Sequence, residues 1–197
     1  MAAVQTESAR ERVLRVAGEL FYEHGFHAVG IDLIIERAGV AKATLYRHFP
    51  NKDDLIAAYL DAANTQFWAW FDRAADTTLP PADTIARVFD AVATLATSSL
   101  CRGCSFQMAA AEFPDRFHPG HDIALAHKVT VRARLRELAA GAGAQQPDEL
   151  ADSLLLVMDG AFAAARMYGP DNPGRHAGTA ARALINGDAR TSRARRR

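Results

Sequence analysis

Cysteine is scarce in this chain, and long apolar runs are missing. Among its 197 residues are two cysteines, Cys101 and Cys104, which are too few for a disulfide scaffold. No run of about 18 apolar residues occurs, the length at which a segment reads as membrane-spanning. Residues 1–25 mix Glu and Arg with apolar residues and so lack the apolar core of a signal peptide. We therefore expect a cytoplasmic protein with its own hydrophobic core.

Neither sign of charge is in excess, and the common catalytic motifs are missing. Lys and Arg number 23 and so do Asp and Glu, which gives a formal net charge of zero. Any attraction to a polyanion must therefore come from the local placement of single cations and helix N-termini. We find no HExxH, no P-loop, no GxSxG and no di-iron Glu-x-x-His set. The sequence thus predicts a protein that is not an enzyme.

The alternating pattern of a β-strand is also missing, whereas helical periods run through nearly the whole chain. Ser8 with Glu11 three positions later forms a capping box. One helical face then follows, made of Val13, Val16, Ala17, Leu20 and Phe21. Gly25 ends this first helix. The sequence therefore predicts an all-α fold.

The same reasoning places eight further helical segments. Pro50 ends one of them, and Asn51 caps the next, which is long and aromatic at its far end. Residues 114–121 are expected to be irregular. The predicted helices cover about 31–38, 42–49, 51–71, 85–95, a short segment up to 113, 123–139, 147–168 and 175–185.

The region from Gly30 to Lys52 is the most informative part of the sequence. It predicts two short helices separated by a turn at Gly39. The second helix carries side chains that hold phosphates and touch base edges: Lys42, Thr44, Tyr46, Arg47 and His48. A short helix, a tight turn and a polar second helix are typical of a helix-turn-helix that enters the major groove of DNA.

Residues 8–60 resemble the DNA-binding domain of TetR-family transcriptional regulators. The resemblance is carried by Leu20-Phe21, Gly25-Phe26, the turn from Ile34 to Gly39-Val40, the run from Thr44 to Phe49, and Asn51-Lys52. Arg102-Gly-Cys104 and the run from Ala109 to Pro114 look like one branch of that family. The resemblance implies about nine helices, a homodimer, and a small molecule bound in the larger domain.

The resemblance also implies the DNA-binding residues. They are Lys42, Ala43, Thr44, Tyr46, Arg47, His48 and Lys52. Thr44, Tyr46 and His48 match positions that contact the DNA backbone, and Tyr46 also approaches bases. Lys42 and Ala43 match the base-reading start of the recognition helix, and Lys52 matches a phosphate-binding Lys. Two interpretations of Arg47 are open: it contacts a DNA phosphate, or it forms an ion pair with Asp53 or Asp54.

Four positions depart from the family pattern. Ala41 stands where a Ser often caps the recognition helix, which costs about 1 kcal/mol locally. Ala43 stands where Gly is common, and Gly30 where Thr often opens the preceding helix. Asp32 brings a negative charge near the DNA. These departures bear on which DNA sequence is bound, not on the fold.

The predicted architecture has a helix-turn-helix domain over residues 8–54, a ligand-binding and dimerisation domain over 55–187, and a basic disordered tail over 188–197. An excess of aromatic residues and Met between residues 67 and 117 predicts an apolar ligand. The expected pocket residues are Phe67, Trp70, Phe71, Phe106, Met108, Phe113 and Phe117. Ala- and Gly-rich faces in 157–169 and 177–184 suit helices that pack closely in a dimer.

The predicted function is a homodimeric repressor that a small apolar ligand releases from a palindromic operator in double-stranded DNA. No metal and no cofactor is expected. The alternative is a thiol- or metal-dependent redox sensor, or an all-helical enzyme, that uses Cys101 and Cys104. A second CxxC is absent, and the histidines lack a paired spacing, so two reduced thiols at a helix junction are the simpler interpretation.

Overall fold

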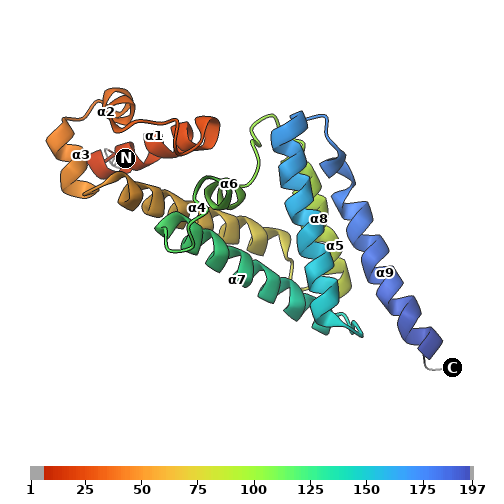
Figure 1. The fold of residues 1–197 in the computed structure, drawn as a ribbon. Helices are drawn as coiled ribbons and strands as arrows, with labels where there is room; N and C mark the ends of the chain where they lie inside the picture. Colours follow the sequence, from red (N-terminus) through yellow and green to blue (C-terminus); the bar gives the residue numbers. More distant parts are fainter. Residues whose placement is uncertain (1–6, 196–197) are drawn as a thin grey trace, which may run out of the picture. The chain divides into compact units, whose positions relative to one another are not determined.

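The computed structural model describes the backbone of residues 7–195 and the side chains of residues 7–188. Within these ranges every regular element is helical, which confirms the predicted all-α fold (Figure 1). The elements are α1 (Ala9–His24), α2 (Ile31–Ala38), α3 (Lys42–His48), α4 (Lys52–Ala74), α5 (Pro81–Ala96), α6 (Ser105–Glu112), α7 (Pro119–Gly141), α8 (Pro147–Tyr168), a 3₁₀ turn η1 (Pro173–His176) and α9 (Ala177–Arg195).

Helix α1 begins and ends at the residues that the sequence predicts. The Ser8 side chain accepts a hydrogen bond from the Glu11 backbone N–H, and the Glu11 carboxylate accepts one from the Ser8 N–H. The five residues of the predicted apolar face are all buried. Gly25 follows the helix with φ +89°, a conformation that favours glycine. The start, the apolar face and the end of this helix are therefore as the local sequence predicts.

Two helices begin earlier than predicted, and both begin at a proline. Helix α5 starts at Pro81 rather than near Ile85, and α7 starts at Pro119 rather than near Ile123. A proline inside a helix breaks it, because it lacks the N–H that would donate to the preceding turn. In the first turn a proline is favourable, because its fixed φ is helical and the N–H groups there have no partner within the helix. The segment around Pro119 predicted to be irregular is therefore partly helical. Helix α8, also opened by a proline, has the predicted bounds.

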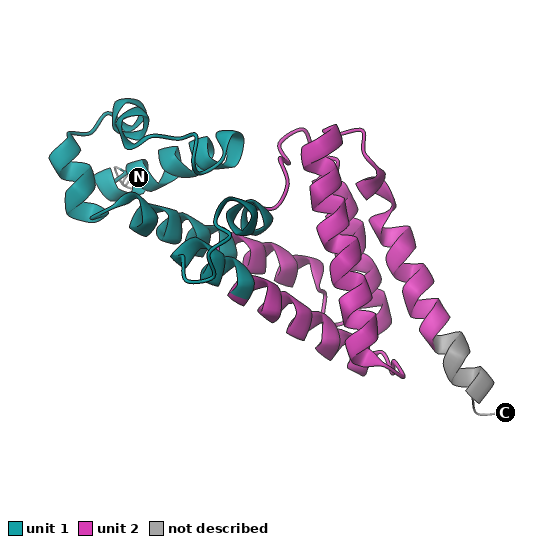
Figure 2. Cartoon of the chain, viewed as in Figure 1, with its two compact units in different colours: residues 1–64, 105–125 teal, residues 65–104, 126–197 magenta. Residues whose placement is uncertain are grey.

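The chain divides into two compact units (Figure 2). Unit 1 contains residues 1–64 and 105–125, and unit 2 contains residues 65–104 and 126–197. The first boundary lies within α4, after residue 64 rather than at the expected residue 54, and α6 and the start of α7 are grouped with the N-terminal helices. Helix α9 continues to Arg195, whereas a disordered tail is predicted from residue 188. Residues 196–197 lie outside the described part of the chain.

Within unit 2, helices α5, α8 and α9 pack against one another. Buried side chains of α5 and α8, such as Phe89, Val92 and Leu154, form part of its core. Asn172 is buried next to η1, where its amide donates to the carbonyl oxygens of Ala96 and Gly169 at 2.8 Å and 2.6 Å. This amide therefore fixes the turn between α8 and α9. No helix in the described residues is both long and apolar enough to cross a membrane.

Candidate nucleic-acid interface

The turn between α2 and α3 is built by Gly39. This residue has φ +60° and ψ +43°, and its N–H bonds to the carbonyl oxygens of Ile35 and Glu36 at the end of α2. A left-handed residue at this position is a common way to end a helix. Ala41 then precedes α3 without a side-chain cap, as its identity predicts. The predicted helix-turn-helix is therefore present in unit 1.

Helix α3 has one buried face and one polar exposed face. Leu45 and Phe49 are buried, with exposed fractions of 0% and 2%. Thr44 and His48 are half-buried beside them. Four of the predicted DNA-binding residues are exposed on this helix, namely Lys42, Ala43, Tyr46 and Arg47. The structure thus brings together, on one short helix, six of the seven residues that the sequence analysis named.

The seventh residue, Lys52, opens α4 and is half-buried. Burial lowers the pKa of its ammonium group, and the negative charges of Glu112 and Asp53 oppose that lowering. Asn51 caps the same helix end, because the Asp54 N–H donates to its side-chain oxygen at 2.8 Å. The N-cap predicted at Asn51 is therefore confirmed.

Arg47 is not paired with either aspartate that the sequence offers it. Asp53 lies 3.5 Å from His118, measured from Oδ1 to Nε2, and Asp54 accepts from the Asn51 amide. Among the described residues no ion pair joins Arg47 to Asp53 or Asp54. The described part of the structure therefore does not contain the Arg47 ion pair that is the alternative interpretation, and a phosphate contact by Arg47 stays a prediction.

Lys42 has an acidic neighbour. Its Nζ donates to Asp32 Oδ1 at 3.1 Å, across the turn that joins α2 to α3. This hydrogen bond with Asp32 raises the pKa of Lys42. Asp32 remains 86% exposed, so the pair lies on the surface. The negative charge expected near the DNA is therefore placed directly on a predicted base-reading residue.

Two arginines of α1 pack onto the helix-turn-helix. Arg12 Nε donates to the carbonyl oxygen of Ala38 at 2.8 Å, at the C-terminus of α2. The guanidinium of Arg10 lies over the ring of Phe49, 5.2 Å from its centroid. Both therefore help to orient α2 and α3 within unit 1.

An aromatic cluster in unit 2 contains three of the expected pocket residues. Phe67 contacts Trp68, Trp70 and Phe71, with ring centroids 5.3 Å, 5.5 Å and 5.9 Å apart. Phe71 is fully buried, whereas the other three are half-buried. The ring of His127 stands edge-on to Phe67 at 4.7 Å. Desolvation by burial, with a smaller contribution from Lys128, lowers the pKa of His127 to about 3, so this ring is neutral at pH 7.

The other expected pocket residues belong to unit 1. Phe106 and Met108 are buried on α6. Phe113 is buried against Phe26 and stacks on the His118 ring with centroids 3.9 Å apart. Phe117 is 95% exposed, so its side chain does not line an enclosed pocket in this structure. Its aromatic ring alone suggested a pocket, but the turn between α6 and α7 directs it to solvent.

The cysteines lie at a junction before α6. Cys101 is buried in the core of unit 2 and Cys104 is half-buried, and both are free thiols. Gly103 between them has φ +103°, and a Cβ there would lie 3.1 Å from the Cβ of Arg166. Arg166 donates to the Arg102 carbonyl oxygen at 3.1 Å. In the part of the chain with described side chains, no three His, Cys, Asp or Glu residues are grouped to hold a metal.

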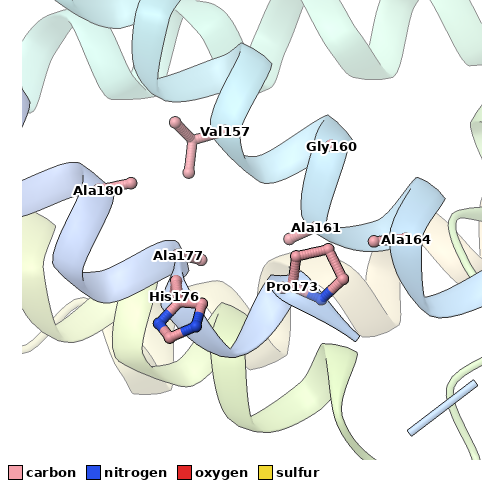
Figure 3. Close-up of a pocket in the computed structure, with 9 residues that line it drawn as sticks. Val157, Gly160, Ala161, Ala164, Pro173, His176, Ala177 and Ala180 are labelled. Atoms are coloured by element: carbon pink, nitrogen blue, oxygen red, sulfur yellow. The ribbon is translucent and has the colours of Figure 1, made fainter. Parts of the chain in front are cut away.

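Small residues line a groove between α8 and the η1–α9 segment (Figure 3). The groove has a volume of about 200 Å³. In the close-up, Val157, Gly160, Ala161 and Ala164 of α8 face Pro173, His176, Ala177 and Ala180. The faces that the sequence analysis singled out as rich in Ala and Gly therefore meet here.

Known proteins are similar to this chain both in its helix-turn-helix region and along most of its length. A family model described as "Bacterial regulatory proteins, tetR family" matches residues 13–59. SCO4454, a TetR-family transcriptional regulator from Streptomyces coelicolor, is 35% identical in sequence, with a TM-score of 0.87 over 92% of this chain and 96% of that one. This chain belongs to the TetR family of transcriptional regulators. It is accordingly a DNA-binding regulator of transcription.

Curated relatives in the TetR family are similar over the N-terminal part. The HTH-type transcriptional activator FasR of Mycolicibacterium smegmatis is 44% identical over 54 residues, which are 27% of this chain and 25% of FasR. The HTH-type transcriptional regulator UidR of Escherichia coli is 39% identical over 62 residues, 30% of this chain and 32% of UidR. The match thus spans about a quarter to a third of these relatives, which share the DNA-binding end.

One contact in unit 1 has no local sequence signal. Glu112, at the end of α6, accepts hydrogen bonds from the backbone N–H groups of Phe26 and His27, at 3.0 Å and 2.7 Å. The partners are 86 and 85 positions apart in the sequence. A lone Glu before Phe-Pro gives no sign of such a contact.

Proposed function

We propose that this TetR-family regulator is a homodimeric repressor, and that a small, largely apolar ligand releases it from a palindromic operator. The observation that carries the proposal is the exposed face of α3, where Lys42, Tyr46 and Arg47 are exposed while Leu45 is buried. A recognition helix of this kind presents its N-terminal residues to base edges and its flanks to phosphates.

The seven DNA-binding residues have different roles in this proposal. Lys42 and Ala43, at the start of α3, read base edges. Thr44, Tyr46, Arg47 and His48 contact the DNA backbone, with Tyr46 also approaching bases, and Lys52 binds a phosphate. Contacts to phosphates set affinity and its salt dependence, whereas contacts to base edges set sequence preference. Variants of the phosphate-contacting residues should therefore change affinity and its salt dependence, whereas variants of the base-reading residues should change sequence preference.

The dimer is proposed to form through α8 and α9. Leu156 and Met167 of α8 are 73% and 75% exposed, which is unusual for large apolar side chains. They lie on one face of the helix, with Gly160 and Ala163 exposed between them. Helix α9 contributes a second face of small residues, including half-buried Ala180 and exposed Ala183. Pairing of these faces across a two-fold axis buries the apolar side chains in a four-helix bundle.

The ligand is proposed to bind at the half-buried rings of the aromatic cluster formed by Phe67, Trp68, Trp70, Phe71 and His127. Apolar pockets with few polar groups select apolar ligands. His127 brings no positive charge there at pH 7, because burial lowers its pKa to about 3. A flat or aromatic, uncharged molecule is therefore the expected effector.

Helix α4 connects the two activities in this proposal. It is one continuous helix from Lys52 to Ala74, so it contains both a proposed phosphate contact and the cluster residues Phe67 to Phe71. A ligand changes operator affinity only by preferring the form that does not bind DNA. A loss of about 100-fold in operator affinity corresponds to about 2.7 kcal/mol of coupling.

A ligand screen followed by an operator titration tests the proposal. Compounds that raise the melting temperature of the protein are identified first, and operator affinity is then measured with and without each. Effectors are expected to lower operator affinity, and Trp70→Ala is expected to weaken their binding. Compounds that stabilise the protein yet leave operator affinity unchanged would refute the coupling. Expression of a reporter from the operator should rise when this protein is deleted, and a fall would indicate an activator.

A further inference from the structure

Helix α6 is tied to the DNA-binding helices at both of its ends. At its start, the Ser105 hydroxyl and the Tyr59 hydroxyl of α4 are 2.7 Å apart. At its end, the Glu112 carboxylate binds the Phe26 N–H through Oε1 at 3.0 Å and the His27 N–H through Oε2 at 2.7 Å. All of these residues lie in unit 1, where α6 is grouped with the N-terminal helices (Figure 2).

The loop between α1 and α2 is shaped around the Glu112 side chain. A Cβ on Gly25 would lie 2.6 Å from Glu112 Oε1, so only glycine allows the carboxylate to come this close. The loop also contacts the backbone of Glu112, because His27 Nε2 lies 2.8 Å from the Glu112 carbonyl oxygen. Three hydrogen bonds therefore join two adjacent loop residues to one residue of α6.

Aromatic packing reinforces the same contact. The Phe113 ring contacts Phe26 and His27, with centroids 5.5 Å and 5.0 Å apart. The His118 ring stacks in parallel on Phe113, and His121 Nδ1 lies 2.7 Å from the Phe113 carbonyl oxygen. The end of α6 is thus held firmly against the loop that leads into α2.

The position of this loop matters for DNA binding because α2 and α3 follow it directly. Residues 28–30 are all that separates His27 from the start of α2. Helix α1 has a side-chain cap and a buried face of its own, whereas α2 follows Gly30 at its N-cap with no side-chain cap. A carboxylate that satisfies two successive backbone N–H groups supplies the ordering that this entry to α2 lacks.

We propose that Glu112 is a positioning residue for DNA binding: its carboxylate holds the α1–α2 loop, and with it α2 and α3, in the arrangement that fits the major groove, and its release lowers operator affinity. The inference rests on the proposed function, because its test measures binding to an operator. It adds a specific contact through which α6 controls the recognition helix.

Two effects of Glu112 on DNA affinity have opposite signs, which makes the proposal testable. Its negative charge acts on Lys52, and removing a negative charge near a proposed phosphate contact strengthens DNA binding. Removing the loop contact weakens it. Glu112→Gln has nearly the same shape but loses the charge and keeps only one acceptor oxygen. We expect a net loss of about 10-fold in operator affinity, or about 1.4 kcal/mol.

The experiment compares the full-length wild type, Glu112→Gln, Glu112→Asp and the control Glu137→Gln. Glu137 is exposed on α7 and pairs with Arg134, so its substitution makes the same charge change away from the loop. The probe is a duplex selected by the wild type from a random-sequence pool. Glu112→Asp, one methylene shorter, should also bind more weakly, and Glu137→Gln should match the wild type. Amide exchange at Phe26, His27 and α2 should be faster only in the Glu112 variants.

Each outcome decides one part of the account. If the wild type enriches no duplex, the proposed function fails, and the exchange rates still show whether Glu112 orders the loop. If the wild type enriches a duplex and Glu112→Gln binds it as well or better, the positioning role is wrong. A lower melting temperature with unchanged operator affinity and unchanged exchange at α2 would likewise overturn it, because it indicates stability alone.

Discussion

Lys42 and Asp32 form an ion pair across the helix-turn-helix, with Nζ and Oδ1 3.1 Å apart. The pair joins the first turn of α2 to the first residue of α3. Both side chains are exposed, and Asp32 offsets part of the positive charge of Lys42. In the proposed function, DNA has to compete with Asp32 for this lysine.

The first prediction concerns Asp32→Asn. Loss of the negative charge removes the repulsion between Asp32 and nearby phosphates, so affinity for DNA of any sequence should rise several-fold and the salt slope should steepen by up to about one unit. Fluorescence anisotropy with random and selected duplexes over a range of salt concentrations measures both. Asp72→Asn, an exposed site in unit 2, is the control and should change neither. Equal affinities and slopes for Asp32→Asn and the wild type would show that the pair has no role in binding.

The second prediction concerns Lys52→Ala. Loss of one phosphate contact should weaken binding to all sequences alike and lower the salt slope by about one unit. Lys42→Ala should instead alter which bases are preferred. The control is Arg87→Ala, which removes an exposed cation of unit 2 that pairs with Asp76. An unchanged slope for Lys52→Ala would mean that the assigned docking of α4 on DNA is wrong.

The third prediction concerns His127 and pH. Its pKa is lowered from 6.5 to about 3 in the folded protein, so only the unfolded chain takes up a proton between these values. Protonation of His127 therefore stabilises only the unfolded chain, and the free energy of unfolding falls as the pH drops from 6.5 toward 3. From pH 8 to pH 5 the loss should be about 2 kcal/mol. Urea denaturation of the wild type and His127→Phe measures it, and an equally steep pH dependence in the variant would contradict the assignment.

The fourth prediction concerns Asn172→Ala. The Asn172 side chain donates to two carbonyl oxygens and accepts from the Gly174 N–H at 2.7 Å, in a site that is 1% exposed. Truncation leaves these buried groups unsatisfied, which should cost about 2–4 kcal/mol of unfolding free energy. The midpoint of urea denaturation measures this cost, with exposed Asn186→Ala as the control. A loss below about 0.5 kcal/mol, typical of a surface site, would contradict this role.

Much of the fold follows from short-range sequence patterns. The Ser8–Glu11 capping box, the Asn51 cap and the turn at Gly39 were all predictable, because each depends on residues within one helical turn. The exposed face of α3 was predictable for the same reason. The starts of α5 and α7 were placed too late, since Pro81 and Pro119 read equally well as breaks and as first-turn residues.

Features that depend on distant residues were not predictable from one sequence. Glu112 contacts a loop 85 residues away, and nothing near it in the sequence indicates that contact. The membership of α6 in unit 1 was missed for the same reason. The aromatic residues were recognised as a group, but composition alone did not separate the cluster around Phe67 from Phe113, packed in unit 1, or from exposed Phe117.

The most direct test of the account is the size and symmetry of the complex with DNA. A duplex is selected from a random pool by the wild type, and sedimentation then gives the number of chains bound to it. We predict a pseudo-palindrome whose half-sites lie about 34–36 Å apart, or a multiple of that distance, with one dimer, or two on a longer site. Selection of an asymmetric sequence that holds a single chain, or of no sequence at all, would contradict a dimer that reads DNA through α3.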